Sequence, residues 1–105
     1  MKVLLVITTV DSQEEAEKLA ETIVKERLGA CVQIIGPIKS IYEWKGKIEN
    51  AEEWILFIKT LEPNYSSLES RLKELHPYEV PEIIAIPVSF GLKDYLSWIK
   101  EVVKS

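Results

Sequence analysis

One segment, residues 30–60, limits the possible folds of this chain more than any other. It reads ACVQIIGPIKSIYEWKGKIENAEEWILFIKT, and its β-branched and aromatic residues predict two long strands, Ala30 to Trp44 and Lys47 to Thr60. The Lys45-Gly46 pair between them has its glycine second, as a type I′ hairpin turn prefers. Gly36-Pro37 interrupts the first strand and predicts a bulge or an edge position. The fold must therefore contain one unusually long β-hairpin.

Further elements are expected on both sides of this hairpin. An apolar strand, Val3 to Thr9, precedes a helix that Ser12 can cap, with Glu15 completing a capping box. A second helix can start near Pro63 and must end at His76-Pro77, because the residue before a proline is pushed out of helical geometry. The strand EIIAIPV follows, and a last helix carries an apolar face made of Leu92, Tyr95, Leu96, Ile99, Val102 and Val103.

The predicted order is β-α-β-β-α-β followed by a C-terminal helix. This order is typical of the ferredoxin-like, split βαβ class of α+β folds, whose sheet is antiparallel. A small doubly wound sheet would place a helix between every pair of strands, which the long hairpin disfavours. A chain of 105 residues is long enough for a single core and too short for two. We therefore predict one domain, residues 1–105.

The strands are apolar in a way that predicts self-association. A strand with one solvent-exposed face alternates apolar and polar residues, whereas a strand buried on both faces is apolar throughout. The stretches VLLVI (3–7), WILFI (54–58) and IIAI (83–86) do not alternate. The helices between strands can cover only one face of the sheet, and large bare apolar patches are rare on monomers. We expect other copies of the chain to cover the second face, with Tyr42 and Trp44 on the projecting hairpin near a neighbour.

Charge and cysteine content restrict the partners and the compartment. The net charge of −4 disfavours nucleic acid and anionic membranes, which attract basic surfaces. The longest apolar runs fall far below the roughly 20 residues of a membrane-spanning helix. The single cysteine, Cys31, allows no disulfide within the chain and suits a reducing compartment. We expect a soluble cytoplasmic protein with no membrane or nucleic-acid partner.

Several segments together resemble a known family, the CutA divalent-cation tolerance proteins. They occur in the family's order and cover nearly the whole chain: ERLGACV (26–32), YEWKGKIE (42–49), IKT (58–60), HPYEVPEI (76–83) and DYLSW (94–98). The resemblance implies a ferredoxin-like homotrimer that associates with copper or another divalent cation and has no established reaction. It leaves room for a further, unidentified protein partner.

His76 is the one candidate metal ligand that the resemblance leaves in this chain. Some family members have a cysteine where this chain has Ile7, and a second histidine where it has Leu75. Cys31 is expected at the opposite end of the sheet from His76, so the two cannot share a metal ion within one chain. Imidazole suits copper, and nearby carboxylates could add oxygen ligands, so weak copper binding at His76 is predicted. The alternative role is structural, with the imidazolium at the C-terminal end of the second helix.

Catalysis is not expected, because the sequence lacks a nucleophile elbow, a Cys-His pair within reach and a glycine-rich phosphate loop. A second binding hypothesis resembles the nitrogen-regulatory signalling trimers, in which long loops sense small molecules. Strand directions gather the hairpin end and the HPYE corner at one end of the sheet. A small-ligand cleft or a trimer interface is predicted there, formed by Tyr42, Trp44, Lys59, Tyr78 and Glu79.

Overall fold

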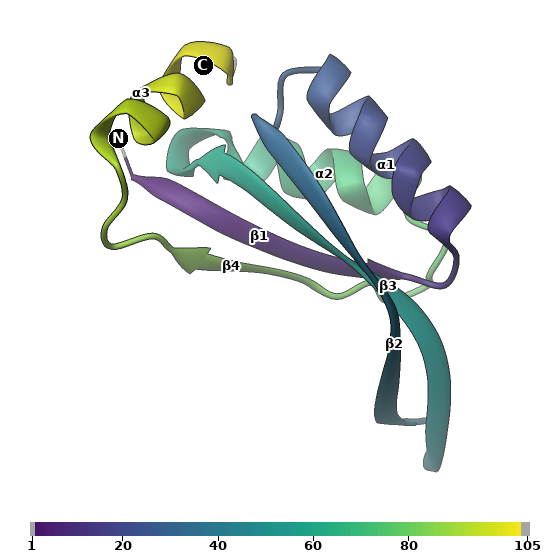
Figure 1. Cartoon of the computed structure of the whole chain (residues 1–105). Helices are drawn as coiled ribbons and strands as arrows, with labels where there is room; N and C mark the ends of the chain where they lie inside the picture. The colour runs from purple at the N-terminus through teal and green to yellow at the C-terminus, as the bar shows by residue number, and fades with distance from the viewer. Residues whose placement is uncertain (1, 104–105) are drawn as a thin grey trace.

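The computed structural model describes residues 2–103 and has the predicted ferredoxin-like architecture (Figure 1). Its four strands form one antiparallel sheet in the order β2-β3-β1-β4. None of the helices within residues 2–103 has the length and apolar character needed to span a bilayer. The elements are β1 (Val3–Val10), α1 (Gln13–Lys25), β2 (Cys31–Trp44), β3 (Lys47–Leu61), the 3-10 helix η1 (Glu62–Asn64), α2 (Tyr65–Leu75), β4 (Ile83–Pro87) and α3 (Lys93–Val102).

The hairpin of β2 and β3 extends well beyond the other two strands as a twisted arm (Figure 1). At its tip Lys45 and Gly46 both have positive φ values, 51° and 82°, which agrees with the predicted type I′ turn. The pairing register shifts between Ile35 and Ile38, which confirms the bulge predicted at Gly36-Pro37. The arm is therefore a continuous two-stranded ribbon that bends away from the sheet at this bulge.

Helices α1 and α2 lie against the same face of the sheet (Figure 1). Ser12 Oγ accepts a hydrogen bond from the Glu15 amide at 3.1 Å, which fixes the start of α1 as predicted. Val24 lies on the outer side of α1 and is 43 % exposed. The core beneath the two helices consists of Leu4, Val6, Val10, Ala16, Leu19, Ile23, Leu56, Ile58, Leu68 and Leu72.

The second face of the sheet is covered by helix only at one end. There Ile99 of α3 and the C-cap residue Val103 pack against Val3 and Leu61. The prediction that Leu92 and Tyr95 belong to the buried side of α3 is wrong, because they are 73 % and 40 % exposed. Leu92 is the N-cap residue, outside the helical periodicity on which that prediction rested.

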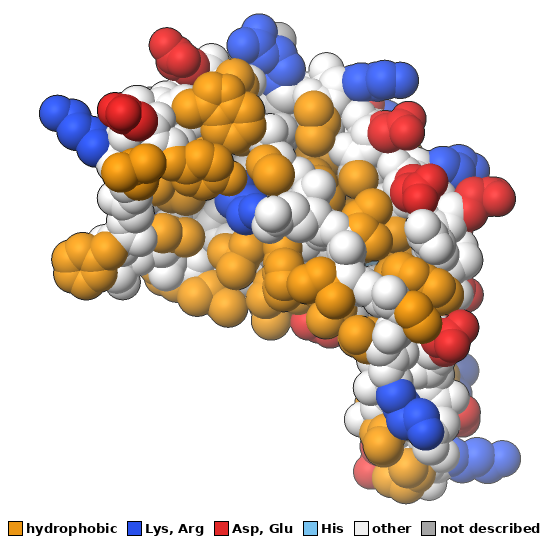
Figure 2. Space-filling model, viewed as in Figure 1, with side chains coloured by type: hydrophobic (Ala, Val, Ile, Leu, Met, Phe, Trp, Pro, Cys, Tyr) orange, Lys and Arg blue, Asp and Glu red, His pale blue; other side chains and the backbone are white. Residues whose placement is uncertain are grey.

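We call the rest of this second face the open face. The strand register and the alternation of side chains place twelve residues on the open face. Only two of them, Glu53 and Lys59, are charged. Hydrophobic side chains spread along this side of the molecule in Figure 2. The remaining members are Leu5, Ile7, Thr9, Cys31, Gln33, Ile35, Ile55, Phe57, Ile84 and Ile86.

The bulge predicts a strict requirement for glycine at position 36. A Cβ atom added to Gly36 would lie 2.2 Å from Cδ1 of Trp54, closer than any normal contact. We expect Gly36→Ala to lower the free energy of unfolding by about 1–3 kcal/mol, measured by urea denaturation at fixed protein concentration. In a Trp54→Ala background the same change should cost much less, because the ring is gone. An equal cost in both backgrounds would contradict this packing account.

Candidate functional site

A groove of about 660 Å³ lies where the hairpin arm leaves the sheet. Ser40, Tyr42, Trp44 and Glu53 line it from one face of the arm, as the register beyond the bulge requires. The segment that follows α2 supplies the opposite wall with Tyr78, Glu79, Val80 and Glu82, and Thr9 contributes from the end of β1. The groove therefore combines aromatic rings with carboxylates from two separate parts of the chain, the arm and the segment after α2.

The structure brings together four of the five residues predicted to form a cleft or an interface. Tyr42, Trp44, Tyr78 and Glu79 all line the groove. Lys59 does not, because it pairs with Leu5 and Cys31 toward the other end of β3, six residues from Glu53 or about 20 Å along the strand. Its amino group contacts Gln33 Oε1 and lies 3.9 Å from Cys31 Sγ.

Glu53 is a groove residue that sequence reasoning missed. It is only 6 % exposed, although a glutamate side chain is normally solvated. Its Oε2 accepts a hydrogen bond from the Tyr78 hydroxyl at 2.6 Å. The alternation of side chains along β3 could have indicated this burial. Glu53 is two residues before Ile55 and therefore shares its face of the sheet.

Tyr78 keeps its proton in this contact. Burial, followed by the hydrogen bond to Glu53 and the negative charge of that side chain, holds the pKa of Tyr78 well above its usual value of 10. The hydroxyl is therefore a permanent donor at neutral pH, and it fixes one oxygen of the carboxylate. The other oxygen, Oε1, has no hydrogen-bond or ion-pair partner within residues 2–103.

His76 ends α2 and joins it to the groove. Its Nε2 lies 2.8 Å from the Thr9 carbonyl, which can only accept, so Nε2 carries the proton. Its Nδ1 then accepts a hydrogen bond from the Tyr78 amide at 3.1 Å. Burial lowers the pKa of His76, which keeps the ring neutral at pH 7. The ring thus binds strand β1 as a neutral group, and the suggested imidazolium at the helix end is wrong.

The described residues do not fit a dedicated copper site within one chain. Both nitrogens of His76 are already hydrogen-bonded, so a metal ion could reach Nδ1 only by displacing the Tyr78 amide. Within residues 2–103 no group of three His, Cys, Asp or Glu side chains is placed to hold a metal ion. Cys31 lies beside Lys59, away from His76 at the end of β1, as expected from the strand directions.

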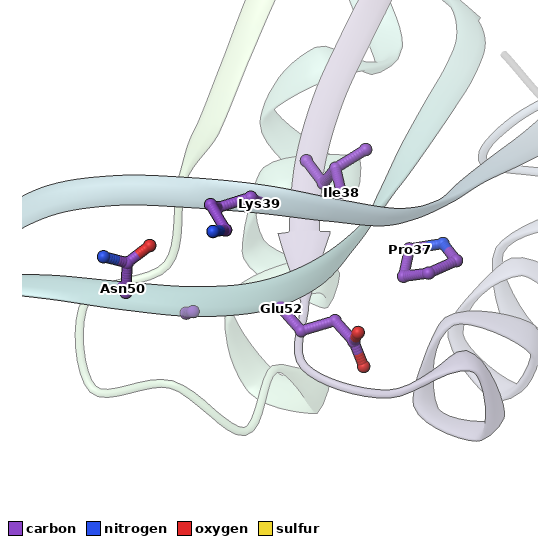
Figure 3. A pocket seen from close by; sticks show the side chains of 6 residues that line it. Pro37, Ile38, Lys39, Asn50 and Glu52 are labelled. Carbon is purple, nitrogen blue, oxygen red and sulfur yellow. The ribbon is translucent and has the colours of Figure 1, made fainter.

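The opposite face of the arm has different chemistry. A hollow of about 350 Å³ there is lined by Pro37, Lys39, Asn50 and Glu52, among others (Figure 3). Glu52 and Glu53 are neighbours in sequence, but they point to opposite faces of β3. Glu52 is therefore a natural control for any role assigned to Glu53.

Comparison with known proteins agrees with this fold. Residues 4–102 match the family model described as CutA1 divalent ion tolerance protein. This chain belongs to that family. It is 43% identical over 97 residues to the divalent-cation tolerance protein CutA of Thermus thermophilus, covering 92% of this chain and 94% of that protein. It is also 43% identical to the human protein CutA, of which the match spans 54%.

Solved structures of the family have the same fold. The divalent cation tolerance protein CutA1 from Thermus thermophilus superimposes with a TM-score of 0.95 at 41% identity, covering 97% of this chain and 99% of that one. CutA1 from Oryza sativa gives a TM-score of 0.97 at 38% identity, with 99% and 95% of the two chains covered. These names denote tolerance of divalent cations or the family itself, and none of them denotes an enzyme.

The contact between Tyr78 and Glu53 predicts that two tyrosine hydroxyls contribute unequally to the free energy of unfolding. Tyr78→Phe removes the hydrogen bond that holds a buried carboxylate and should lower the free energy of unfolding by about 1–3 kcal/mol. Tyr65→Phe removes a similar bond to Glu69, but on the exposed surface, and should cost less than about 0.5 kcal/mol. Urea denaturation of both variants checks this, and equal costs would count against a tightly held Glu53.

The neutral state of His76 predicts a pH dependence of stability. Because the folded pKa lies below the ordinary value of 6.5, the unfolded chain binds the proton first as the pH falls. The contribution is complete above about pH 6.5 and is lost as the pH falls toward the folded pKa. Unfolding measured between about pH 7.5 and 5.5 should therefore show stability falling less steeply in His76→Gln than in the unmodified chain. Identical slopes would exclude His76 as a source of this dependence.

Proposed function

We propose that this chain acts in divalent-cation tolerance as a homotrimer whose copies cover one another's open faces. The observation that carries the proposal is the composition of the open face, which has ten uncharged residues and only two charged ones, Glu53 and Lys59. Ile35, Ile84 and Ile86 are each close to half exposed there in the single chain. Burying such a surface provides the main driving force for association.

Three is the number of copies that the family resemblance implies, and the shape of the chain supports contact beyond the sheet. The arm carries Ile41 and Ile48, which are 65 % and 73 % exposed. Apolar side chains on a projecting ribbon are suited to pack against a neighbouring copy. The open face and the arm would then belong to one continuous interface.

Contact with copper or another divalent cation is proposed to be weak in a single chain. His76 lacks a free nitrogen, and residues 2–103 contain no cluster of three metal-ligating side chains. A dedicated site normally supplies three or four such ligands at fixed geometry. Stronger binding would therefore require ligands from more than one copy.

Small-molecule sensing is the second candidate function, and the groove favours it. Its volume of about 660 Å³ lies within the range of about 300–1,000 Å³ typical of ligand sites. Four of its residues were predicted from sequence to gather at this end of the sheet. In this candidate function the trimer holds the groove in place, and binding of a small molecule in the groove is the event that the protein senses.

Assembly through the open face is tested by placing a charge at its centre. Phe57 lies on the open face, paired with Ile7 and Gln33 on the neighbouring strands. We expect Phe57→Glu to reduce the sedimentation mass to that of a single chain, because a buried unpaired carboxylate opposes association. Val24→Glu places the same charge on the exposed side of α1 and should leave the trimer intact. A trimer that survives Phe57→Glu would refute the proposed interface.

The role of His76 in copper binding is tested by titration. We expect the trimer to bind Cu²⁺ with a Kd in the micromolar range or weaker, and His76→Gln to change that Kd by less than about twofold. The physical reason is that both ring nitrogens are already engaged in the folded chain. Isothermal titration of both proteins measures this. Submicromolar binding that is lost in the variant would show that copper displaces the Tyr78 amide and uses His76.

A further inference from the structure

We propose that the groove between the arm and the α2–β4 segment binds a small organic cation, an amine or quaternary ammonium compound, through the Glu53 carboxylate and the aromatic rings of Tyr42 and Tyr78. The inference rests on the second candidate function, in which the groove is a ligand site. It names the chemical class of that ligand.

The first argument is the charge at the base of the groove. Glu53 is buried, yet the partner that the described residues give its carboxylate is the neutral Tyr78 hydroxyl. No Lys, Arg or His side chain lies within ion-pair distance of it among residues 2–103. Buried carboxylates are normally paired with a cation. The unpaired oxygen Oε1 thus leaves a place for positive charge in the groove.

The second argument is the wall of aromatic rings. Tyr42, Trp44 and Tyr78 line the groove together with Glu53. Aromatic faces attract cations, and Trp attracts them most strongly. The chain already shows this preference, since the amino group of Lys45 lies 5.7 Å from the centroid of the Trp44 ring. Tyr78 contacts the Glu53 carboxylate directly and Tyr42 lies on the same face of the arm, whereas Trp44 pairs with Lys47, six residues from Glu53 along β3. Tyrosine rings beside a buried carboxylate form a combination that recognises an ammonium group.

The third argument separates an organic cation from a metal ion. Calcium takes six to eight oxygen ligands and magnesium a near-octahedral set. The groove offers the carboxylates of Glu53, Glu79 and Glu82, but residues 2–103 contain no cluster of three such groups close enough to bind one ion. An ammonium group needs only one close carboxylate and apolar or aromatic surroundings. Val80 in the groove lining suits its carbon substituents.

The test uses the full chain and a matched pair of ligands. Choline is titrated by calorimetry at constant ionic strength, beside its neutral carbon isostere dimethylbutanol, which has the same shape without the charge. We expect choline to bind at millimolar concentration or below and the isostere not to bind. Glu53→Gln should weaken choline binding at least about tenfold, or 1.4 kcal/mol. Glu52→Gln, on the other face of β3, should leave it within about twofold.

Tyr42→Leu gives a second variant, because Tyr42 is 45 % exposed and its replacement is compatible with folding. It should weaken choline binding while light scattering shows an unchanged mass. Equal binding of choline and its isostere would overturn the inference, as would unchanged affinity in both Glu53→Gln and Tyr42→Leu. A trimer that binds no choline would mean that a neighbouring copy fills the groove. That result would overturn the ammonium site and leave the proposed trimer intact. A monomer that binds choline would instead overturn the proposed trimer and leave the ammonium site intact.

Discussion

The uncovered apolar face of the sheet is the constraint on which the rest of the structure depends. In a βαββαβ chain both connecting helices pack on one side, and here α3 reaches only the end of the other side, against Val3 and Leu61. Open-face residues such as Leu5, Ile7 and Phe57 cannot be hidden within a single chain. We propose that further copies of the chain cover these residues, because burying apolar surface is favourable, and the hairpin arm enlarges the surface that such copies can share.

The same architecture creates the groove. The bulge after Ile35 bends the arm away from the sheet, and the proline-rich segment after α2 closes the opposite side. His76 links these parts, since its ring binds the Thr9 carbonyl and the Tyr78 amide, while the Tyr78 hydroxyl binds Glu53. This continuous chain of hydrogen bonds makes the corner rigid and places a buried carboxylate beside aromatic rings. His76 is thus best understood as a positioning residue of the groove.

Sequence patterns predicted the fold almost completely, because hairpin turn chemistry, helix ends and strand composition are local properties. The site was predicted less well. Tyr42, Trp44, Tyr78 and Glu79 meet as expected, but Lys59 lies some six residues too far along β3, because strand register was not applied to it. Glu53 was missed because burial of a carboxylate depends on the Tyr78 hydroxyl, a contact between residues 25 positions apart. The bonding of both His76 nitrogens likewise depends on the tertiary structure.

The central claim is that the open face is buried between copies of the chain, and the mass of the unmodified protein in solution tests it most directly. Light scattering coupled to size exclusion, over a range of micromolar concentrations, should give a constant mass of three chains of 12.0 kDa each. A stable mass of one chain across that range would contradict the claim. The apolar residues of the open face would then be exposed to water, and the physical basis of the proposed assembly would be lost.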